Sequence, residues 1–180
     1  MAFSINQAKS IITHPALTYN FIMQGIPNVN TLNIKGAQVP GKKVDEIALK
    51  LRGRDVFYNG NIARFDPFSI TVFEDISYTA RTMIELWSQV IADNGTGFGF
   101  ANPAITKDLT IYLLAPGTEY IMAAYTLHNA FPVNLGSVSL SYDNATEVFS
   151  YPVEFRYDYW DRKDISGFTN ISEIAGNLGL

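Results

Sequence analysis

The chain has 180 residues, which is long enough to bury a sizeable core. It has no cysteine, which excludes a disulfide framework, a thiolate metal site and a cysteine nucleophile. Charged residues make up only 17% and the net charge is −4, a balance that argues against a surface built to grip nucleic acid. No segment is apolar and long enough to act as a secretory signal or to span a membrane, so we expect a β-rich protein that is made in the cytoplasm and does not insert into membranes.

The first third of the chain favours short strands after an N-terminal arm, residues 1–15. Over residues 18–24, large apolar side chains alternate with polar ones, which predicts a strand. A weaker strand is expected over residues 31–34. Pro40 and Gly41 then interrupt any regular structure.

Residues 42–64 predict a long hairpin that carries much of the positive charge. Ile47, Leu49 and Leu51 alternate with smaller or charged residues as in a strand, and Asn59-Gly60 is a strong hairpin-turn signal. A protruding hairpin of this kind is a plausible contact arm, and a solvated loop is the alternative. The residues expected to make the contact are Arg52, Arg54, Asp55, Val56, Phe57 and Tyr58.

Residues 65–95 change from a period of two to a period of 3.6. Phe68, Ile70 and Val72 alternate with polar residues and predict a strand, and an amphipathic helix is expected from Ile76 to Ile91. We expect negative charge at the start of this helix, a left-handed stop at its end, and a lid over a β core. The residues of the apolar stripe are Ile76, Ala80, Met83, Ile84, Trp87, Val90 and Ile91, the acidic residues are Glu74 and Asp75, and the stop is Asn94-Gly95.

The second half of the chain favours strands. A strand is predicted over residues 109–114, and one over 119–128 that is apolar on both faces and therefore central or covered. After a connection over residues 131–136, the clearest alternation predicts a strand over 138–142, and a long aromatic strand follows over 147–160. Pro152 cannot donate to a ladder, so we expect it at a bulge or an unpaired position.

Chemistry-bearing patterns are missing from the sequence. His14 and His128 stand apart from other metal ligands, and Glu154 and Asp158 flank Arg156 instead of forming an isolated acid pair. The glycines at 95, 97 and 99 follow a helix, so they lack the strand-to-helix context of a phosphate loop. We therefore expect neither an enzyme nor a cofactor, and the aromatic strands with a contact arm indicate assembly.

The order of these features resembles the tail tube proteins of contractile-tailed bacteriophages. The match covers roughly residues 16–161, and no single motif in it is diagnostic. It consists of Pro40-Gly41, Gly53-Arg54-Asp55-Val56, Asn59-Gly60, the strand from Phe68 to Val72, Glu74-Asp75, a helix with Arg81 and Trp87, the block from Phe131 to Tyr142, and the ending Tyr157-Asp158-Tyr159-Trp160.

This resemblance implies a mainly β, α+β fold with one long helix: an antiparallel β-sandwich or barrel that contributes strands to a β-barrel shared across a hexameric ring. It implies one domain over residues 1–161, an inter-ring arm at 42–64 and a C-terminal extension at 162–180. Lumen-lining candidates are Glu154, Arg156 and Asp158, and the expected core anchors are Phe68, Trp87, Tyr157 and Trp160; Phe68 stands where the family more often has tryptophan.

The function that the resemblance implies is structural. Stacked rings would form the inner tube of a phage tail, a conduit for double-stranded DNA, with sheath, baseplate, tail terminator and, before ejection, a tape measure protein as partners. Two related alternatives are the tube of a bacterial contractile injection system and a tube-initiating baseplate protein. A lipocalin-like or carbohydrate-binding β module is an alternative of another class, and it should be a ligand-binding monomer.

Overall fold

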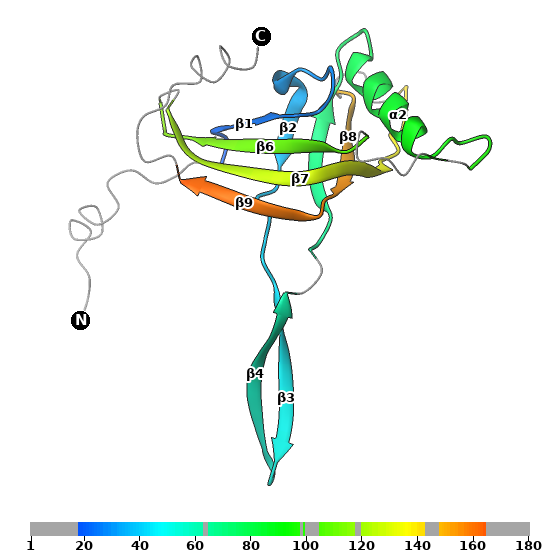
Figure 1. Cartoon of the computed structure of the whole chain (residues 1–180). Helices are drawn as coiled ribbons and strands as arrows, with labels where there is room; N and C mark the ends of the chain where they lie inside the picture. The colour runs from blue at the N-terminus through cyan, green and yellow to red at the C-terminus, as the bar shows by residue number, and fades with distance from the viewer. Residues whose placement is uncertain are drawn as a thin grey trace.

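The computed structural model describes residues 18–62, 65–97, 99, 105–117, 120–142 and 148–164. They form an antiparallel β body with one α-helix and a projecting hairpin (Figure 1). The elements are β1 (Phe21–Gln24), η1 (Thr31–Asn33), β2 (Ile34–Ala37), β3 (Val44–Leu51), β4 (Arg54–Ile62), β5 (Phe68–Phe73), α2 (Thr79–Ile91), β6 (Lys107–Leu114), β7 (Ile121–Leu135), β8 (Ser150–Arg156) and β9 (Tyr159–Asp164).

Two groups of strands meet at β7 to enclose the core. Strand order is β1-β6-β7-β8-β5-β2, and β9 pairs with β7. The first half of β7 lies between β6 and β9, whereas its last residues pair with β8. The bend between the halves falls at Asn129, whose φ of 56° lies in the left-handed region that Asn tolerates better than most residues. Strands of the first group run across the body, and β5 and β8 run along the direction of the hairpin (Figure 1).

The predicted alternation on β5 and β8 is confirmed and builds the core. Phe68, Ile70 and Val72 are buried, and so are Tyr151, Val153 and Phe155 on the facing strand. The register pairs Phe68 with Phe155 and Val72 with Tyr151, so the large side chains of the two strands stand side by side. The core is therefore specified by period-two patterning that matches the pleat.

The α-helix is present but shorter than the sequence predicts. It begins at Thr79, after Tyr78 in a left-handed conformation, and Ile76 is 97% exposed. The expected role of Glu74 and Asp75 at its first turn is wrong: Glu74 is buried against Tyr151, and Asp75 accepts a hydrogen bond from the Ser77 N–H.

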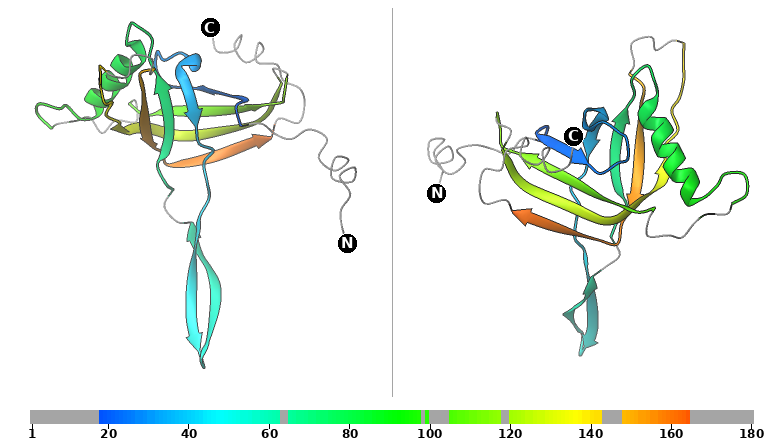
Figure 2. Two further views of the ribbon diagram at one scale, coloured as in Figure 1. Left: turned by 180° about the vertical axis from the view of Figure 1, so that it is seen from behind. Right: turned by 45° about the horizontal axis from the view of Figure 1, so that its top comes forward.

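The end of the helix also differs from the predicted left-handed stop at Asn94-Gly95. Ala92 is extended, and Asp93 Oδ1 accepts from the N–H groups of Gly95 and Thr96. Those backbone donors hold the pKa of Asp93 below its usual value. Ala80, Ile84 and Trp87 are buried, whereas Val90 is exposed, so the helix lies beside β8 as a lid with a narrower apolar stripe (Figure 2).

Several predicted strand boundaries in the second half are wrong. Residues 131–136, expected as a connection, continue β7 as far as Leu135, and the strand expected over 138–142 is not formed. The long strand predicted over 147–160 is two strands, because the chain turns a corner between Arg156 and Tyr159. β9 runs to Asp164, so it extends past the expected domain boundary at residue 161.

The remaining differences lie near the N-terminus and at Pro152. The strand expected over 31–34 is a 3₁₀ turn followed by β2, and the first strand covers only Phe21–Gln24. Pro152 lies within the β5–β8 ladder opposite Thr71, but past the last β7 pair, Leu135 with Val153. The expectations for residues 1–15 and 165–180 fall outside the described residues. No α-helix in the described ranges is long and apolar enough to cross a membrane.

Candidate assembly surfaces

The hairpin of β3 and β4, here called the arm, stands clear of the body (Figures 1 and 2). Its turn is Arg52-Gly53, with φ values of 48° and 80°, and positive φ at both positions gives the twist that two antiparallel strands require. The predicted turn at Asn59-Gly60 is therefore wrong. Gly60 lies inside β4 at a register shift, where an added Cβ would come within 2.7 Å of the Asp45 carbonyl oxygen.

The arm is amphipathic across its two faces. Cross-strand pairing places Ile47 opposite Tyr58 and Leu49 opposite Val56, so these side chains share one face with Leu51. The opposite face pairs Lys50 with Asp55 and carries Phe57. About half of the surface of Ile47, Leu49 and Leu51 is exposed. We refer to Ile47, Leu49, Leu51, Val56 and Tyr58 as the apolar face of the arm; a contiguous exposed patch of this kind marks an interaction surface.

The six contact residues expected from the sequence all lie in the distal part of the arm, but they do not form one surface. Arg52 and Arg54 are at the turn, whereas the other four are divided between its two faces. Sequence reasoning did not assign Ile47, Leu49 and Leu51 to the contact. Their period-two alternation was the available signal, and it identifies them once the register is known.

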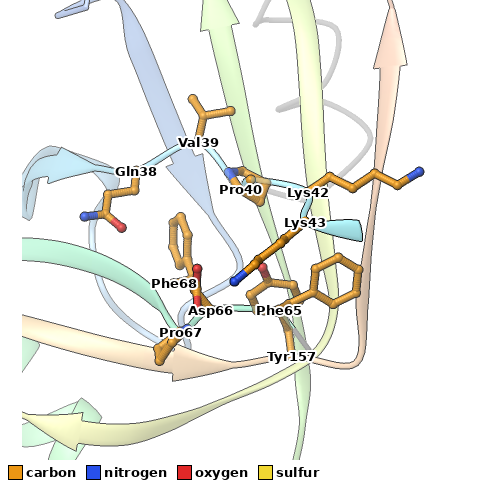
Figure 3. Close-up of a pocket in the computed structure, with 11 residues that line it drawn as sticks. Gln38, Val39, Pro40, Lys42, Lys43, Phe65, Asp66, Pro67, Phe68 and Tyr157 are labelled. Atoms are coloured by element: carbon orange, nitrogen blue, oxygen red, sulfur yellow. The ribbon is translucent and has the colours of Figure 1, made fainter. Parts of the chain in front are cut away.

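The root of the arm is fixed to the corner between β8 and β9. Arg156 Nη1 donates to the Phe65 carbonyl at 2.8 Å, and Trp160 Nε1 donates to the Gly41 carbonyl at 3.2 Å. Tyr157 stacks on Phe65 with ring centroids 5.6 Å apart. Phe65 and Tyr157, together with residues 38–43 and 66–68, line a cavity of about 220 Å³ beside the root (Figure 3).

The four aromatic residues expected as core anchors lie in two places, the core and the root of the arm. Phe68 and Trp87 are buried, and Trp87 packs on Phe155 and donates from Nε1 to the Ile105 carbonyl at 2.8 Å. Tyr157 and Trp160 are only partly buried and hold the arm root. Burial, and then the nearby charge of Asp66, raise the pKa of Tyr157, which keeps its phenol neutral at the root.

The lumen candidates do not share one strand face. Glu154 and Arg156 lie two residues apart on β8, so they point to the same side, away from the buried Phe155. Asp158 lies beyond the end of β8 and accepts from Asn129 Nδ2 at 2.8 Å. Its expected place beside Glu154 is wrong because the chain leaves the strand after Arg156.

His128 lies in a structural network at the bend of β7. Its Nδ1 is 3.0 Å from Asp108 Oδ2 and its Nε2 is 3.4 Å from Asp161 Oδ1, so the ring connects β6, β7 and β9. The Tyr159 ring stacks on the imidazole at 4.5 Å. Within the described ranges no group of three or more His, Asp or Glu side chains is placed to hold a metal ion.

Comparison with known proteins agrees with this arrangement. A family model described as "Phage tail tube protein" matches residues 3–163. The chain is 24% identical to tail tube protein gp19 of Enterobacteria phage T4 over 132 residues, covering 73% of this chain and 80% of the relative. It is 25% identical to the tail tube protein of Serratia phage KSP90 over 119 residues, covering 66% of each.

Solved structures show the same fold at lower identity. The tube-terminating cap of the anti-feeding prophage aligns with a TM-score of 0.64 and 18% identity, covering 84% of this chain and 92% of that one. A chain of the PVC extracellular contractile injection system, solved as a sheath–tube complex in the extended state, gives 0.63 and 16%, covering 91% and 100%. With the family model spanning nearly the whole body and the arm, the chain belongs to the phage tail tube protein family, whose members are structural components of the virion tail and not enzymes.

Proposed function

We propose that this chain forms the inner tube of a contractile phage tail as stacked six-fold rings that make a conduit for genome delivery. The observation that carries the proposal is the arm, a hairpin whose apolar face is exposed along its length in a member of the tail tube family. Such a face needs a protein partner. In a chain that assembles with itself, the nearest partner is another copy.

Within a ring, open sheet edges supply the contact between neighbours. Among the described strands, β2 pairs only with β5 and β9 only with β7, so each presents an unpaired edge. Pairing such edges around six copies closes a barrel and removes edges that would otherwise template aggregation. The barrel is the shared inner wall of the proposed tube.

We propose that the β8 face with Glu154 and Arg156 faces the lumen, with Asp158 at its rim. A lumen of low or negative net charge would limit sticking of DNA phosphates during transit. The carboxylates supply the negative charge, and the hydrogen bond from Arg156 to the Phe65 carbonyl directs its guanidinium group towards the arm root. Cryo-EM of assembled tubes would test this: a β8 face that points outward would overturn the assignment.

Between rings, the arm makes the contact. An arm at one end of a subunit that binds a different surface on the next subunit is a heterologous contact, which propagates as a filament instead of closing. Sheath, baseplate and tail terminator are the proposed outer and end partners, supported by related folds in sheath–tube, baseplate and terminator assemblies. A tape measure protein and then DNA would occupy the lumen.

Negative-stain microscopy of the purified full chain tests the proposal. We expect rings and filaments from the wild-type chain, and rings without filaments from Leu49→Lys, which places a charge on the apolar face. Ala48→Lys adds the same charge to the opposite face of the same strand and should still stack. Compact monomers of the wild-type chain at every concentration would refute the proposed function.

A further inference from the structure

The chain contains two Asn-Gly dipeptides, at residues 59–60 and 94–95, and neither plays the structural part that the sequence predicts. This dipeptide is also chemically reactive. Glycine has no Cβ, so its backbone nitrogen can approach the side chain of the preceding asparagine closely. Once that nitrogen has lost its proton, it can attack the side-chain carbonyl carbon. The two dipeptides are therefore the places at which this chain is most open to modifying itself.

The reaction at Asn94 is a deamidation in two balanced steps. In the first, the Gly95 nitrogen forms a bond to Asn94 Cγ, and the amide nitrogen leaves as ammonia with the proton that the Gly95 nitrogen has lost. In the second, one water molecule opens the resulting cyclic imide at either of its carbonyl carbons. The product is aspartate or isoaspartate, which adds one negative charge to a chain whose net charge is −4.

Asn94 lies in an exposed turn over residues 93–97, just after α2. The Gly97 N–H donates to the Asp93 carbonyl at 2.9 Å and closes the turn. Within it, Asp93 Oδ1 accepts from the Gly95 N–H at 2.8 Å and from the Thr96 N–H at 2.7 Å. The nitrogen that would attack Asn94 is therefore hydrogen-bonded to the carboxylate of the preceding residue.

This hydrogen bond opposes the first step of the reaction. Asp93 is ionised at neutral pH, because the N–H groups of Thr96 and Gly95 hold its pKa below the usual value. Loss of the Gly95 proton would place a second negative charge 2.8 Å from the carboxylate oxygen. It would also break a hydrogen bond to a charged acceptor, which is stronger than one to a neutral acceptor. Both effects raise the barrier to cyclisation.

Asn59 has the same dipeptide without such a carboxylate. It lies on β4, where it pairs with Glu46 of β3, and the residue before it is Tyr58. In the described part of the chain, no side-chain carboxylate accepts a hydrogen bond from the Gly60 N–H. Its reactivity depends on opening of the β3–β4 ladder and not on Asp93. Asn59 therefore serves as an internal reference for Asn94.

We propose that Asn94 is a self-modification site of this chain, and that Asp93 slows its deamidation by holding the Gly95 N–H. The product would set a second carboxylate beside Asp93, and isoaspartate would also lengthen the main chain, so the turn would lose its hydrogen bonds. An added Cβ at Gly99 would overlap the Ile91 carbonyl, so the loop after the turn lies directly on the end of α2. Deamidation therefore loosens the cover of that end of the helix.

Peptide mass spectrometry of the full chain, incubated at mildly alkaline pH, tests the proposal. It measures at each Asn-Gly dipeptide the fraction in which NH₂ has been replaced by OH. In Asp93→Ala, Asn94 should convert about tenfold faster than in the wild type, whereas Asn59 should convert at the same rate in both proteins. Equal rates at Asn94, in two proteins that circular dichroism shows to be folded, would overturn the role of Asp93. Faster conversion at Asn59 as well would mean general loosening, and would also overturn it.

Two further measurements test the site and the role of the folded turn. Gly95→Ala fits, since its Cβ would lie 3.3 Å from the Asp93 side chain, but it hinders attack and should slow conversion of Asn94 at least about tenfold. Unchanged conversion in this variant, or none at Asn94 while Asn59 converts, would overturn the site. In urea the turn is lost, so Asp93→Ala should change the rate far less. An equal acceleration in urea would assign the effect to the neighbouring residue alone and contradict the inference.

Discussion

At the scale of single residues, the least expected contact is between Glu74 and Tyr151. The phenol of the buried Tyr151 donates to Glu74 Oε1, and the Arg81 guanidinium lies over its ring at 4.9 Å from the centroid. In the part of the chain that the structure describes, Glu74 Oε2 has no hydrogen-bond partner. The phenol is thus the main hydrogen-bond donor to a buried carboxylate, and losing it should be costly.

Tyr151→Phe should change the pH dependence of stability in alkali. Burial, and then the hydrogen bond and charge of Glu74, raise the pKa of Tyr151 far above its ordinary value of 10. The folded state therefore keeps the proton at pH values at which the unfolded chain loses it. The stabilisation is complete below about pH 10 and falls above it by up to about 1.4 kcal/mol per pH unit.

Urea unfolding of the two proteins between pH 7 and pH 11 measures this effect. At pH 7 the variant should be less stable by about 1–3 kcal/mol, because Glu74 loses its donor. Above pH 10 the free energy of unfolding of the wild type should fall more steeply, so the difference between the proteins should narrow. Parallel curves across this range would contradict the linkage.

Gly136→Ala should destabilise the body, since its new Cβ would meet the Pro152 ring at 2.6 Å. Neither proline nor the paired backbone can move easily, and we expect a loss of about 1–3 kcal/mol. Gly41→Ala is the matched control, because an added Cβ there has no atom within 4 Å. Thermal unfolding of both variants tests this prediction. If the two variants are equally stable, residues 136 and 152 can move apart without loss of stability.

At the scale of elements, the alternation of apolar and polar residues predicted strands correctly where one face is buried in the core and the other is not. β5 and β8 follow their alternation because one face meets the core. Residues 138–142 alternate as clearly but form no strand, since Pro152 stops the ladder they would need. Local sequence cannot show that a partner strand is missing. If the partner belongs to another subunit, the alternation describes the assembled state.

The turn of the arm shows a different limit. Asn59-Gly60 has the stronger turn signal, but Arg52-Gly53 makes the turn. The choice sets the register, and the register decides which side chains share a face. That is why a hairpin could be predicted over residues 42–64 while its apolar face could not. Its role in contacts stays a prediction. The predicted start of the helix is wrong for a similar reason: Glu74 is bound by the buried Tyr151, which is distant in the sequence, and does not lie in the first turn.

Trp87→Ala should destabilise the chain by about 3–5 kcal/mol, since Trp87 packs on Phe155 and bonds to the Ile105 carbonyl. Leu86→Ala is the neighbouring control and should cost far less, because Leu86 is half exposed. We also expect fewer filaments from Trp87→Ala. Its helix carries Arg81, whose Nη1 donates to the Gly136 carbonyl, just past the end of β7, at 3.5 Å. Unaltered filament yield from a folded but destabilised variant would contradict that coupling.

At the scale of the whole molecule, charge is divided between the arm and the body. The arm itself carries three basic and three acidic side chains, and Lys42 and Lys43 at its root make residues 42–62 net positive. The rest of the chain has eight basic and fourteen acidic residues. This division gives the subunit a direction. In the proposed tube, the basic side chains at the root and the turn of the arm would be attracted to the acidic remainder of another copy.

Arg54→Glu should therefore weaken stacking more than an equal charge change elsewhere. Arg54 lies at the arm turn, and reversing it should raise the protein concentration needed for filaments about tenfold at low ionic strength, a cost of about 1.4 kcal/mol. Lys107→Glu, at the exposed start of β6, changes the net charge equally and should have little effect. Sedimentation at several salt concentrations separates the causes. If the arm acts by charge, the gap between the variants closes as salt shortens the Debye length from about 30 Å at 0.01 M towards 3 Å at 1 M. If the gap persists in high salt, Arg54 acts through packing on the apolar face, which it shares with Leu51.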